Sequence, residues 1–206
     1  LNINGGVITG VTGVEIRSGT LNMTGGEVHG ADEGFDAEAN SNGSTTSAVG
    51  IAIVQHTTGN DIDVNITGGT ITGYRALTEA NTQKNDEPIE NISISLSGGK
   101  FIGVNDDSTA NSSVTAEDVT SFIEGGTYVL KDANNGETAD TSLNNSNLIA
   151  EGFTVDSETG SVKSDSESPI IPPIDDDDDY VPIPPVVVDE SSSDDTVTIV
   201  ACVAAA

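Results

Sequence analysis

The sequence has few of the residues on which cross-linked or ring-packed domains depend. Its 206 residues include one Cys, no Trp and 3% aromatic residues. One cysteine excludes a disulfide within the chain, and no Cys/His cluster is present to hold a structural zinc ion. Because rings are scarce and only 34% of residues are hydrophobic, any core must be thin and aliphatic.

Positive charge is also scarce. The chain carries 6 Lys and Arg against 34 Asp and Glu, which gives a formal net charge of -28. A chain of this charge repels nucleic acid instead of releasing its counterions, and it repels anionic lipid headgroups in the same way. We therefore expect no nucleic-acid partner and no direct docking on a membrane surface. No cofactor motif is present, and we expect no cofactor.

The first 130 residues contain an internal repeat, which is the first feature to seek in a chain with 23 Gly. The first four copies have two apolar residues separated by one polar residue, then a polar residue, a Gly-Gly pair and a second short apolar stretch; the last copy departs from this pattern, with Ser121 at the first apolar site and Leu130 at the final Gly site. The copies are LNINGGVITG from Leu1, LNMTGGEVHG from Leu21, VNITGGTITG from Val64, ISLSGGKFIG from Ile94 and SFIEGGTYVL from Ser121.

Each copy predicts two short strands joined by a sharp turn. The alternation of apolar and polar residues is typical of a strand with one buried face. Glycine reaches positive φ without a Cβ penalty, so the pairs should be structural turn residues. They are Gly5 and Gly6, Gly25 and Gly26, Gly68 and Gly69, Gly98 and Gly99, and Gly125 and Gly126.

The spacing of the pairs indicates an all-β solenoid, the right-handed parallel β-helix. The intervals between pairs are 20, 43, 30 and 27 residues, which suits turns of about 20 to 30 residues. The long interval holds either two turns or one turn with an insertion. We favour two, with AVGIAIVQ from Ala48 as an unmarked strand and 31–47 as a protruding loop. A helical solenoid or an antiparallel sandwich explains the recurrent Gly-Gly corner less well.

These GGTITG-type copies resemble the pectate-lyase-like β-helix repeats of bacterial, Firmicutes-like cell-surface proteins described as adhesin-like. The segment SVTAEDVTSFIEGGTYVL from Ser113, followed by LIAEGFTVDSETGSV from Leu148, is similar to the part that closes the repeat domain in those proteins with a short final hairpin. The resemblance implies an exported protein on the bacterial cell surface, held by a C-terminal membrane anchor. A sortase-type LPxTG signal is absent from this sequence.

The composition divides the chain into three parts. We expect the β-helix with its closing hairpin over 1–162, an acidic Pro/Ser-rich disordered spacer over 163–195, and the start of a truncated transmembrane anchor over 196–206. The run Asp175–Asp179 has the oxygen ligands of a calcium site but lacks the spacing and glycine turn of a calcium loop. We interpret it as a solvated charge run.

Enzymes that degrade polysaccharides share this fold, but no catalytic constellation is evident. A lyase of this type needs a base and a cluster of carboxylates. The basic residues of the repeat region are scattered, and its acidic pairs are explained by surface solvation. His29 should point outward from a strand, and His56 should lie at a corner without forming a metal site. The basic residues are Arg17, Arg75, Lys84 and Lys100, and the acidic pairs are Asp61 with Asp63 and Asp106 with Asp107.

Two further kinds of residue have structural explanations. Cys202 falls in the expected anchor, where a buried thiol is favoured over an acylation site. Six Asn-x-Ser/Thr sequons follow from the composition of the chain and carry no functional weight. They begin at Asn22, Asn42, Asn65, Asn91, Asn111 and Asn144.

The sequence thus favours a non-catalytic structural or adhesive module of the cell surface. We expect its loops at 31–47, 78–88 and 104–113 to gather on one face and to bind neutral glycans or host surface proteins. The alternative is a polysaccharide-degrading lyase or glycoside hydrolase of the β-helix type, active or degenerate.

Overall fold

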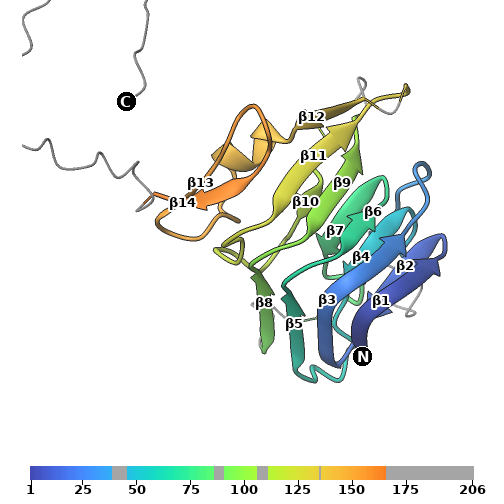
Figure 1. Cartoon of the computed structure of the whole chain (residues 1–206). Coiled ribbons are helices and arrows are strands. Elements are labelled where there is room, and N and C mark those ends of the chain that lie inside the picture. Colours follow the sequence, from blue (N-terminus) through green and yellow to red (C-terminus); the bar gives the residue numbers. More distant parts are fainter. Residues whose placement is uncertain (39–45, 86–90, 106–110, 135, 166–206) are drawn as a thin grey trace, which may run out of the picture. The chain divides into compact units, whose positions relative to one another are not determined.

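The described part of the chain is built almost entirely from short strands. A computed structural model describes residues 1–38, 46–85, 91–105, 111–134 and 136–165, all within a compact unit that spans Leu1–Ile170. These residues form fourteen strands and one 3-10 helix (Figure 1). The prediction of an all-β fold is confirmed.

The strands follow one another with few interruptions. In chain order they are β1 (Asn2–Thr9), β2 (Thr12–Ile16), β3 (Gly19–His29), β4 (Val49–Ile53), β5 (Ile62–Ile66), β6 (Thr70–Thr72), β7 (Arg75–Glu79), β8 (Ile92–Leu96), β9 (Lys100–Val104), β10 (Val114–Thr115), β11 (Thr127–Lys131), β12 (Glu137–Ala139), β13 (Phe153–Val155) and β14 (Val162–Ser164), with the helix η1 (Thr141–Asn145) after β12.

Strands that are distant in sequence pair in parallel and form three ladders. The first ladder joins the start of β1 to β3, β5 and β8. The second joins the ends of β1 and β3 to β6, β9 and β11. The third joins β2, β4, β7 and β10. Figure 1 shows β3, β6, β9 and β11 side by side in chain order. Equivalent residues of successive repeats are therefore stacked.

The core is the stack of inward residues from these ladders. In the second ladder, Val28 pairs with Ile71, Ile71 with Phe101, and Phe101 with Tyr128; all four are fully buried. The rings of Phe101 and Tyr128 are stacked with centroids 4.7 Å apart. Most other core residues are Ile, Leu and Val, which agrees with the thin aliphatic core that the composition predicts.

The two glycines of each pair have different roles. The second glycine has a positive φ in all five pairs, between 80° and 95°. The first does not, but most first glycines lie directly against the preceding repeat: a Cβ on Gly68 would be 2.6 Å from the carbonyl oxygen of Thr24, and one on Gly25 would be 3.1 Å from that of Asn4. The first glycine therefore permits close stacking, and only the second supplies the turn conformation.

The interval between Gly25 and Gly68 holds one turn, and the interpretation as two turns is wrong. Leu21 pairs directly with Val64, and Val28 pairs with Ile71, so no strand of an additional turn lies between these repeats. The segment from Ala48 does contain a strand, β4, but it belongs to the third ladder of the same turn. The extra length lies in the segment between β3 and β4, which we call the 31–47 excursion.

At the C-terminal end the ladders give way to antiparallel pairing, so the sheets are mixed. β12 pairs antiparallel with β11, and β13 with β14 forms the hairpin expected after Leu148. The fully buried Asp140 connects this end to the start of the third ladder's last strand through hydrogen bonds. Its carboxylate accepts hydrogen bonds from the backbone N–H of Ser113 (2.6 Å) and of Ser142 (3.2 Å), and from the hydroxyl of Ser112 (2.9 Å).

Candidate functional site

Two of the three expected loops leave the stack at the same corner. The 31–47 excursion connects β3 to β4, and the 104–113 loop connects β9 to β10, so both lie between the second and third ladders. The 78–88 loop follows β7 and lies at a different corner. The expectation of one common face is therefore wrong for this loop. Residues 39–45, 86–88 and 106–110 of the three loops lie outside the described residues.

The 31–47 excursion packs over the outer face of the third ladder. The backbone N–H of Thr46 donates to the Glu15 carboxylate at 3.0 Å. The Phe35 ring is stacked on Tyr74, with centroids 5.7 Å apart. Ala52 and Thr78, which are paired neighbours of the third ladder, are 0% and 2% exposed. The described residues of the excursion thus form a second layer against β2 and β7.

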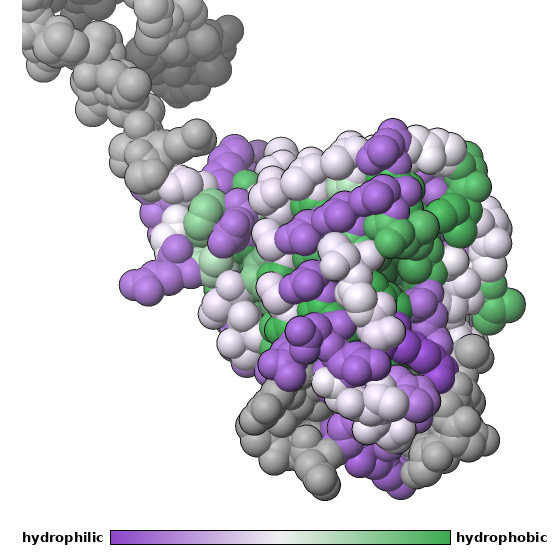
Figure 2. Space-filling view, turned by 90° about the horizontal axis from the view of Figure 1, so that it is seen from below, coloured by the Kyte–Doolittle hydropathy of each residue, from purple (hydrophilic) through white to green (hydrophobic). Residues whose placement is uncertain are grey.

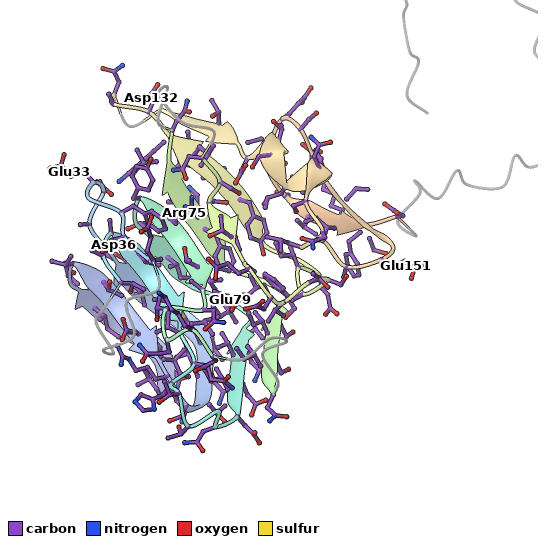
Figure 3. The ribbon with its side chains drawn as sticks, turned by 180° about the vertical axis from the view of Figure 1, so that it is seen from behind. Glu33, Asp36, Arg75, Glu79, Asp132 and Glu151 are labelled. Atoms are coloured by element: carbon purple, nitrogen blue, oxygen red, sulfur yellow. The ribbon has the colours of Figure 1, made fainter. Side chains whose placement is uncertain are left out.

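A cavity of about 280 Å³ lies at the border of this second layer. We call it the Arg75 pocket. Figure 3 shows Arg75 and Glu79 from behind the view of Figure 1, both on β7, with Asp36 of the excursion to one side. The pocket is lined by Phe35, Ala37 and Glu38 of the excursion, by Arg75, Thr78, Glu79 and Ala80, and by Thr115, Ala116 and Glu117 after β10.

Arg75 is held in place by contacts that leave part of its guanidinium unused. Nη1 donates to the Thr115 hydroxyl at 2.8 Å, and the guanidinium carbon lies 4.2 Å from the centre of the Phe35 ring, as in a cation–π contact. Its Nε is buried without a hydrogen-bond partner. Burial lowers the pKa of Arg75 below its ordinary value, against the raising effect of Tyr74 and Glu117.

Glu79 is the second unusual group of the pocket. It is 1% exposed, and its Oε2 accepts the backbone N–H groups of Glu117 and Asp118, each at 2.9 Å. Its Oε1 is buried without a partner. Burial raises the pKa of the Glu79 carboxyl, and the backbone hydrogen bonds from residues 117 to 119 only partly oppose this. Two residues that line the pocket therefore each have one buried polar atom without a hydrogen-bond partner, a donor in Arg75 and an acceptor in Glu79.

This combination suits the binding of a polar, uncharged molecule. A guanidinium donates hydrogen bonds, a carboxylate oxygen accepts them, and the Phe35 ring forms an apolar wall. Glu38, Glu79 and Glu117 line the pocket together with one cation, Arg75, so the pocket disfavours an anion. Its volume is close to the lower end of ordinary small-molecule sites, which begin near about 300 Å³.

The acidic pairs that the sequence singles out lie elsewhere. Asp61 and Asp63 are exposed at β5 of the first ladder and do not line the Arg75 pocket. Asp106, Asp107, Asp175–Asp179 and Cys202 lie outside the described residues. Within the described ranges, no group of three or more His, Cys, Asp or Glu residues could hold a metal ion.

Both histidines lie where the sequence predicts. His29 points outward from β3, with Nδ1 2.8 Å from the Thr72 hydroxyl and Nε2 2.9 Å from the Glu27 carboxylate. His56 lies in the segment after β4, where Nδ1 accepts the backbone N–H of Thr58 at 3.3 Å. These contacts place both rings in ordinary surface hydrogen-bond networks.

Of the four basic residues of the repeat region, two form ion pairs. Arg17 pairs with Glu15 and Lys100 with Glu137, each at 2.6 Å. Lys84 has a positive φ of 52°, which marks a turn after β7. Arg75 alone among the four basic residues of the repeat region lines the pocket, a distinction that the sequence does not indicate.

The described sequons have structural roles. Asn65 donates to Asn22, and Asn22 donates to Asn2, at 3.2 and 3.0 Å, so these side chains form a ladder on the outer face of β1, β3 and β5. Asn111 is 8% exposed, and its amide donates to the carbonyl of Tyr74 at 3.0 Å. Asn91 has positive φ, Asn144 lies in η1, and Asn42 lies outside the described residues.

Comparison with protein-family models, with curated proteins and with solved structures gave no match to this chain. The resemblance to bacterial surface proteins therefore remains a prediction from the repeat and the closing segment. Across the part of the chain that the structure describes, no helix has the length and apolarity to span a membrane. The anchor expected over 196–206 lies outside that part.

Proposed function

We propose that the three ladders are the faces of a right-handed parallel β-helix. The proposal rests on the in-register parallel pairing of successive repeats, such as Leu21 with Val64 and Val64 with Ile94. Between two neighbouring strands of one ladder, the chain passes through the other two ladders. Such crossovers between parallel strands of one sheet are almost always right-handed. The antiparallel strands β12 to β14 then close one end of the coil.

On this scaffold, the chain acts as a non-catalytic recognition module that binds neutral glycans in the Arg75 pocket. The proposal rests on two observations: Arg75 and Glu79 line one cavity together with Phe35, and Arg75 Nε and Glu79 Oε1 are buried without a hydrogen-bond partner. A sugar offers hydroxyl groups that both donate and accept hydrogen bonds, together with an apolar ring face. Each of these features has a counterpart in the pocket.

The charge of the module favours neutral over acidic saccharides. Three glutamates and one arginine line the pocket, and the whole chain carries a net charge of -28. A uronate or sialate would meet repulsion from both. The same repulsion weakens the alternative of a lyase acting on acidic polysaccharides.

The setting of the module follows from the resemblance and from the composition. The acidic Pro-rich spacer over 163–195 suits a tether that extends the domain away from a surface. We propose that this surface is the bacterial cell exterior and that the apolar segment over 196–206 begins the anchor. Fractionation of cells that produce the full-length gene product tests this placement: recovery in the cytosolic fraction would contradict it.

An array of immobilised neutral and acidic oligosaccharides tests the glycan proposal. We expect the 206-residue chain to bind at least one neutral glycan and to bind acidic ones less well. Calorimetric titration with the strongest glycan then compares the chain with Arg75→Met, which keeps the apolar stem and removes the guanidinium. Loss of hydrogen bonds from a charged donor should weaken binding by about 10- to 100-fold.

The matched control is Arg17→Met, since Arg17 is also a partly buried arginine but lies outside the pocket. Unchanged binding by this variant and weakened binding by Arg75→Met would support the site. If no neutral glycan binds, the proposed function is wrong. If both variants bind equally well, the Arg75 pocket is not the site. Release of shortened saccharides that ceases in Glu79→Gln would establish the enzyme alternative instead.

A further inference from the structure

The third ladder ends at a strand with one unpaired edge. Within the described residues, this strand, β10, pairs with β7 and is the last strand of its sheet. In the next turn the chain reverses from β11 into the antiparallel β12 and then forms the 3-10 helix η1. A helix thus occupies the stretch of sequence where a further strand would continue this ladder. Because an edge strand presents unpaired N–H and C=O groups, the end of the third ladder remains polar.

A cavity of about 220 Å³ is lined jointly by residues around β10 and residues of η1. We call it the η1 pocket. Its walls carry hydroxyl and amide groups and apolar side chains, but no charged group, whereas three glutamates and one arginine line the Arg75 pocket. The lining residues are Ser112, Val114, Thr115 and Ala116 around β10, and Ser142, Ser146, Asn147 and Leu148 in and after η1.

The buried carboxylate of Asp140 orients two of the hydroxyl groups in the η1 pocket. The Ser112 hydroxyl donates to this carboxylate at 2.9 Å, and the Ser142 hydroxyl donates to its other oxygen. A hydroxyl group that donates one hydrogen bond keeps two lone pairs with which it can accept. Both serines therefore retain acceptor capacity, and their protons are fixed by a residue that is 0% exposed.

The η1 pocket borders the Arg75 pocket, since Thr115 and Ala116 line both cavities. The Thr115 hydroxyl accepts a hydrogen bond from Arg75 Nη1 at 2.8 Å and donates one to the Thr78 hydroxyl at 3.2 Å. This boundary between the cavities is therefore held in place. The Arg75 pocket has a volume of about 280 Å³ and the η1 pocket one of about 220 Å³. Each is smaller than ordinary small-molecule sites, which begin near about 300 Å³, whereas the two together fall within that range.

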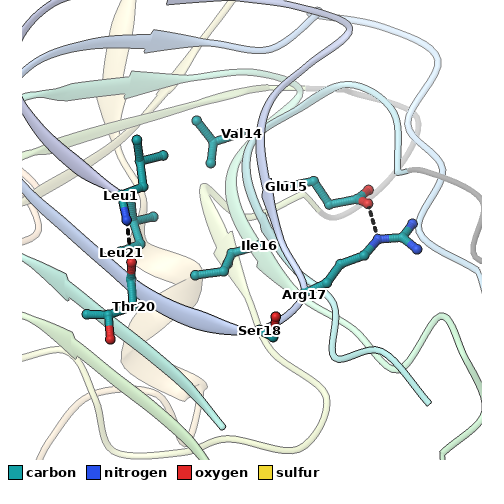
Figure 4. Close-up of a pocket in the computed structure, with 8 residues that line it drawn as sticks. All are labelled: Leu1, Val14, Glu15, Ile16, Arg17, Ser18, Thr20 and Leu21. Atoms are coloured by element: carbon teal, nitrogen blue, oxygen red, sulfur yellow. Dashed lines mark hydrogen bonds and ion pairs between the residues drawn. The ribbon is translucent and has the colours of Figure 1, made fainter. Parts of the chain in front are cut away.

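Two other cavities of the described residues do not extend the Arg75 pocket. One, of about 330 Å³, lies at β2 and the start of β3 (Figure 4), and the other, of about 220 Å³, lies beside Asp32 and Lys131. Neither has a lining residue in common with the Arg75 pocket. The largest apolar area in Figure 2 lies on the right, the side of β1 and β2 in Figure 1, whereas β13 and β14 lie on the left. Of these three cavities, the η1 pocket is the one into which a polar molecule bound at Arg75 can continue.

We propose that the η1 pocket is a second sugar subsite, so that the chain binds a neutral oligosaccharide of at least two sugar units across Thr115 and Ala116. This inference rests on the proposed function of the Arg75 pocket. In the η1 pocket a second sugar ring meets serine hydroxyls that accept hydrogen bonds, an asparagine amide that donates and accepts them, and apolar side chains. Because the lining carries no cation, an acidic sugar unit gains no ion pair there, and the preference for neutral saccharides extends to the second unit.

Calorimetric titration of the 206-residue chain with gluco-, manno- and galacto-oligosaccharides of one to four units tests the proposal. In a series that binds, the disaccharide should bind at least about tenfold more tightly than the single sugar, because it forms several additional hydrogen bonds. Ser142→Phe places a ring in the η1 pocket and should abolish this gain. Asn147→Ala removes one amide and should reduce the gain by about 3- to 10-fold. Neither substitution should weaken the binding of the single sugar.

The matched controls are Ser157→Phe and Asn144→Ala, since both residues are exposed and neither lines either pocket. Both controls should keep the full gain from the second unit, and circular dichroism checks that all four variants remain folded. If a single sugar binds as tightly as the longer chains, or if the gain persists in both Ser142→Phe and Asn147→Ala, the second subsite is overturned and the Arg75 pocket still stands. If no neutral saccharide of any length binds, the proposed function fails, and this inference fails with it.

Discussion

Replacing Gly68 with alanine is expected to destabilise the protein, although this glycine does not have a positive φ. The added Cβ would lie 2.6 Å from the carbonyl oxygen of Thr24 in the preceding repeat. Non-bonded carbon contacts are most favourable at about 3.5–4.0 Å, and a backbone oxygen cannot rotate away as a side chain can. The two repeats must separate locally, which costs about 1–3 kcal/mol in overpacked sites.

The same substitution at Gly5 is the matched control. Gly5 occupies the equivalent position of the first repeat, but nothing lies within 4 Å of its Cβ site. Alanine there restricts the unfolded chain without a clash, so the free energy of unfolding should rise by about 0.4–1 kcal/mol. Gly25→Ala should fall between the two, since its Cβ would lie 3.1 Å from the Asn4 carbonyl oxygen.

Urea unfolding followed by circular dichroism measures all three variants against the parent chain. We expect stability to decrease in the order Gly5→Ala, Gly25→Ala, Gly68→Ala. If the three substitutions lowered the free energy of unfolding equally, the first glycine would have no role in stacking, and a local turn requirement would explain it instead.

Two further predictions concern buried carboxyl groups. Burial raises the pKa of Glu79 in the folded state above its ordinary value of 4.5, which we take for the unfolded chain. The protonated Glu79 side chain therefore contributes its full stabilisation below the unfolded-state pKa. This stabilisation is lost as the pH rises through the folded-state pKa. Glu79→Gln should therefore gain stability relative to the parent as the pH rises, measured by urea unfolding at a series of pH values. Parallel stability curves for this variant and the parent would contradict this. Asp140→Ala leaves the buried backbone N–H of Ser113 without its acceptor, so the free energy of unfolding should fall by about 3 kcal/mol. A fall of less than about 1 kcal/mol would show that water or the nearby serines replace the carboxylate.

The repeat was predictable because its signals are local. Alternation at Leu21 and Met23 identifies a buried strand face, and both residues are fully buried. The recurring Gly-Gly pair identifies the corner between the first and second ladders. The number of turns was not predictable in the same way, because β4 has no Gly-Gly pair and its alternation does not specify which ladder it joins. Only its pairing with β2 and β7 decides that.

The Arg75 pocket could not be derived from the sequence, because its parts are joined by contacts across long separations. Phe35 lies in a segment without apolar periodicity, yet its ring contacts Tyr74 and Arg75. Glu79 ends a strand like many surface residues, and nothing near it in sequence shows that residues 117 and 118 will enclose its carboxylate. Asp140 is similar, since its partners lie both beside it and at Ser112 and Ser113.

The position of the pocket follows from where the second layer ends. On the outer face of the third ladder, Ala52 of β4 is 0% exposed and Thr78 of β7 is 2% exposed, whereas Thr115 of β10 is only partly buried. The described residues of the 31–47 excursion contact β2 through Glu15 and β7 through Arg75, and β10 is less buried. Arg75 and Glu79 belong to β7, the strand next to this border, and both line the cavity there. Because inward positions are occupied by stacking, the border of the second layer is a place where a chain of this design can gain a binding site without losing core contacts.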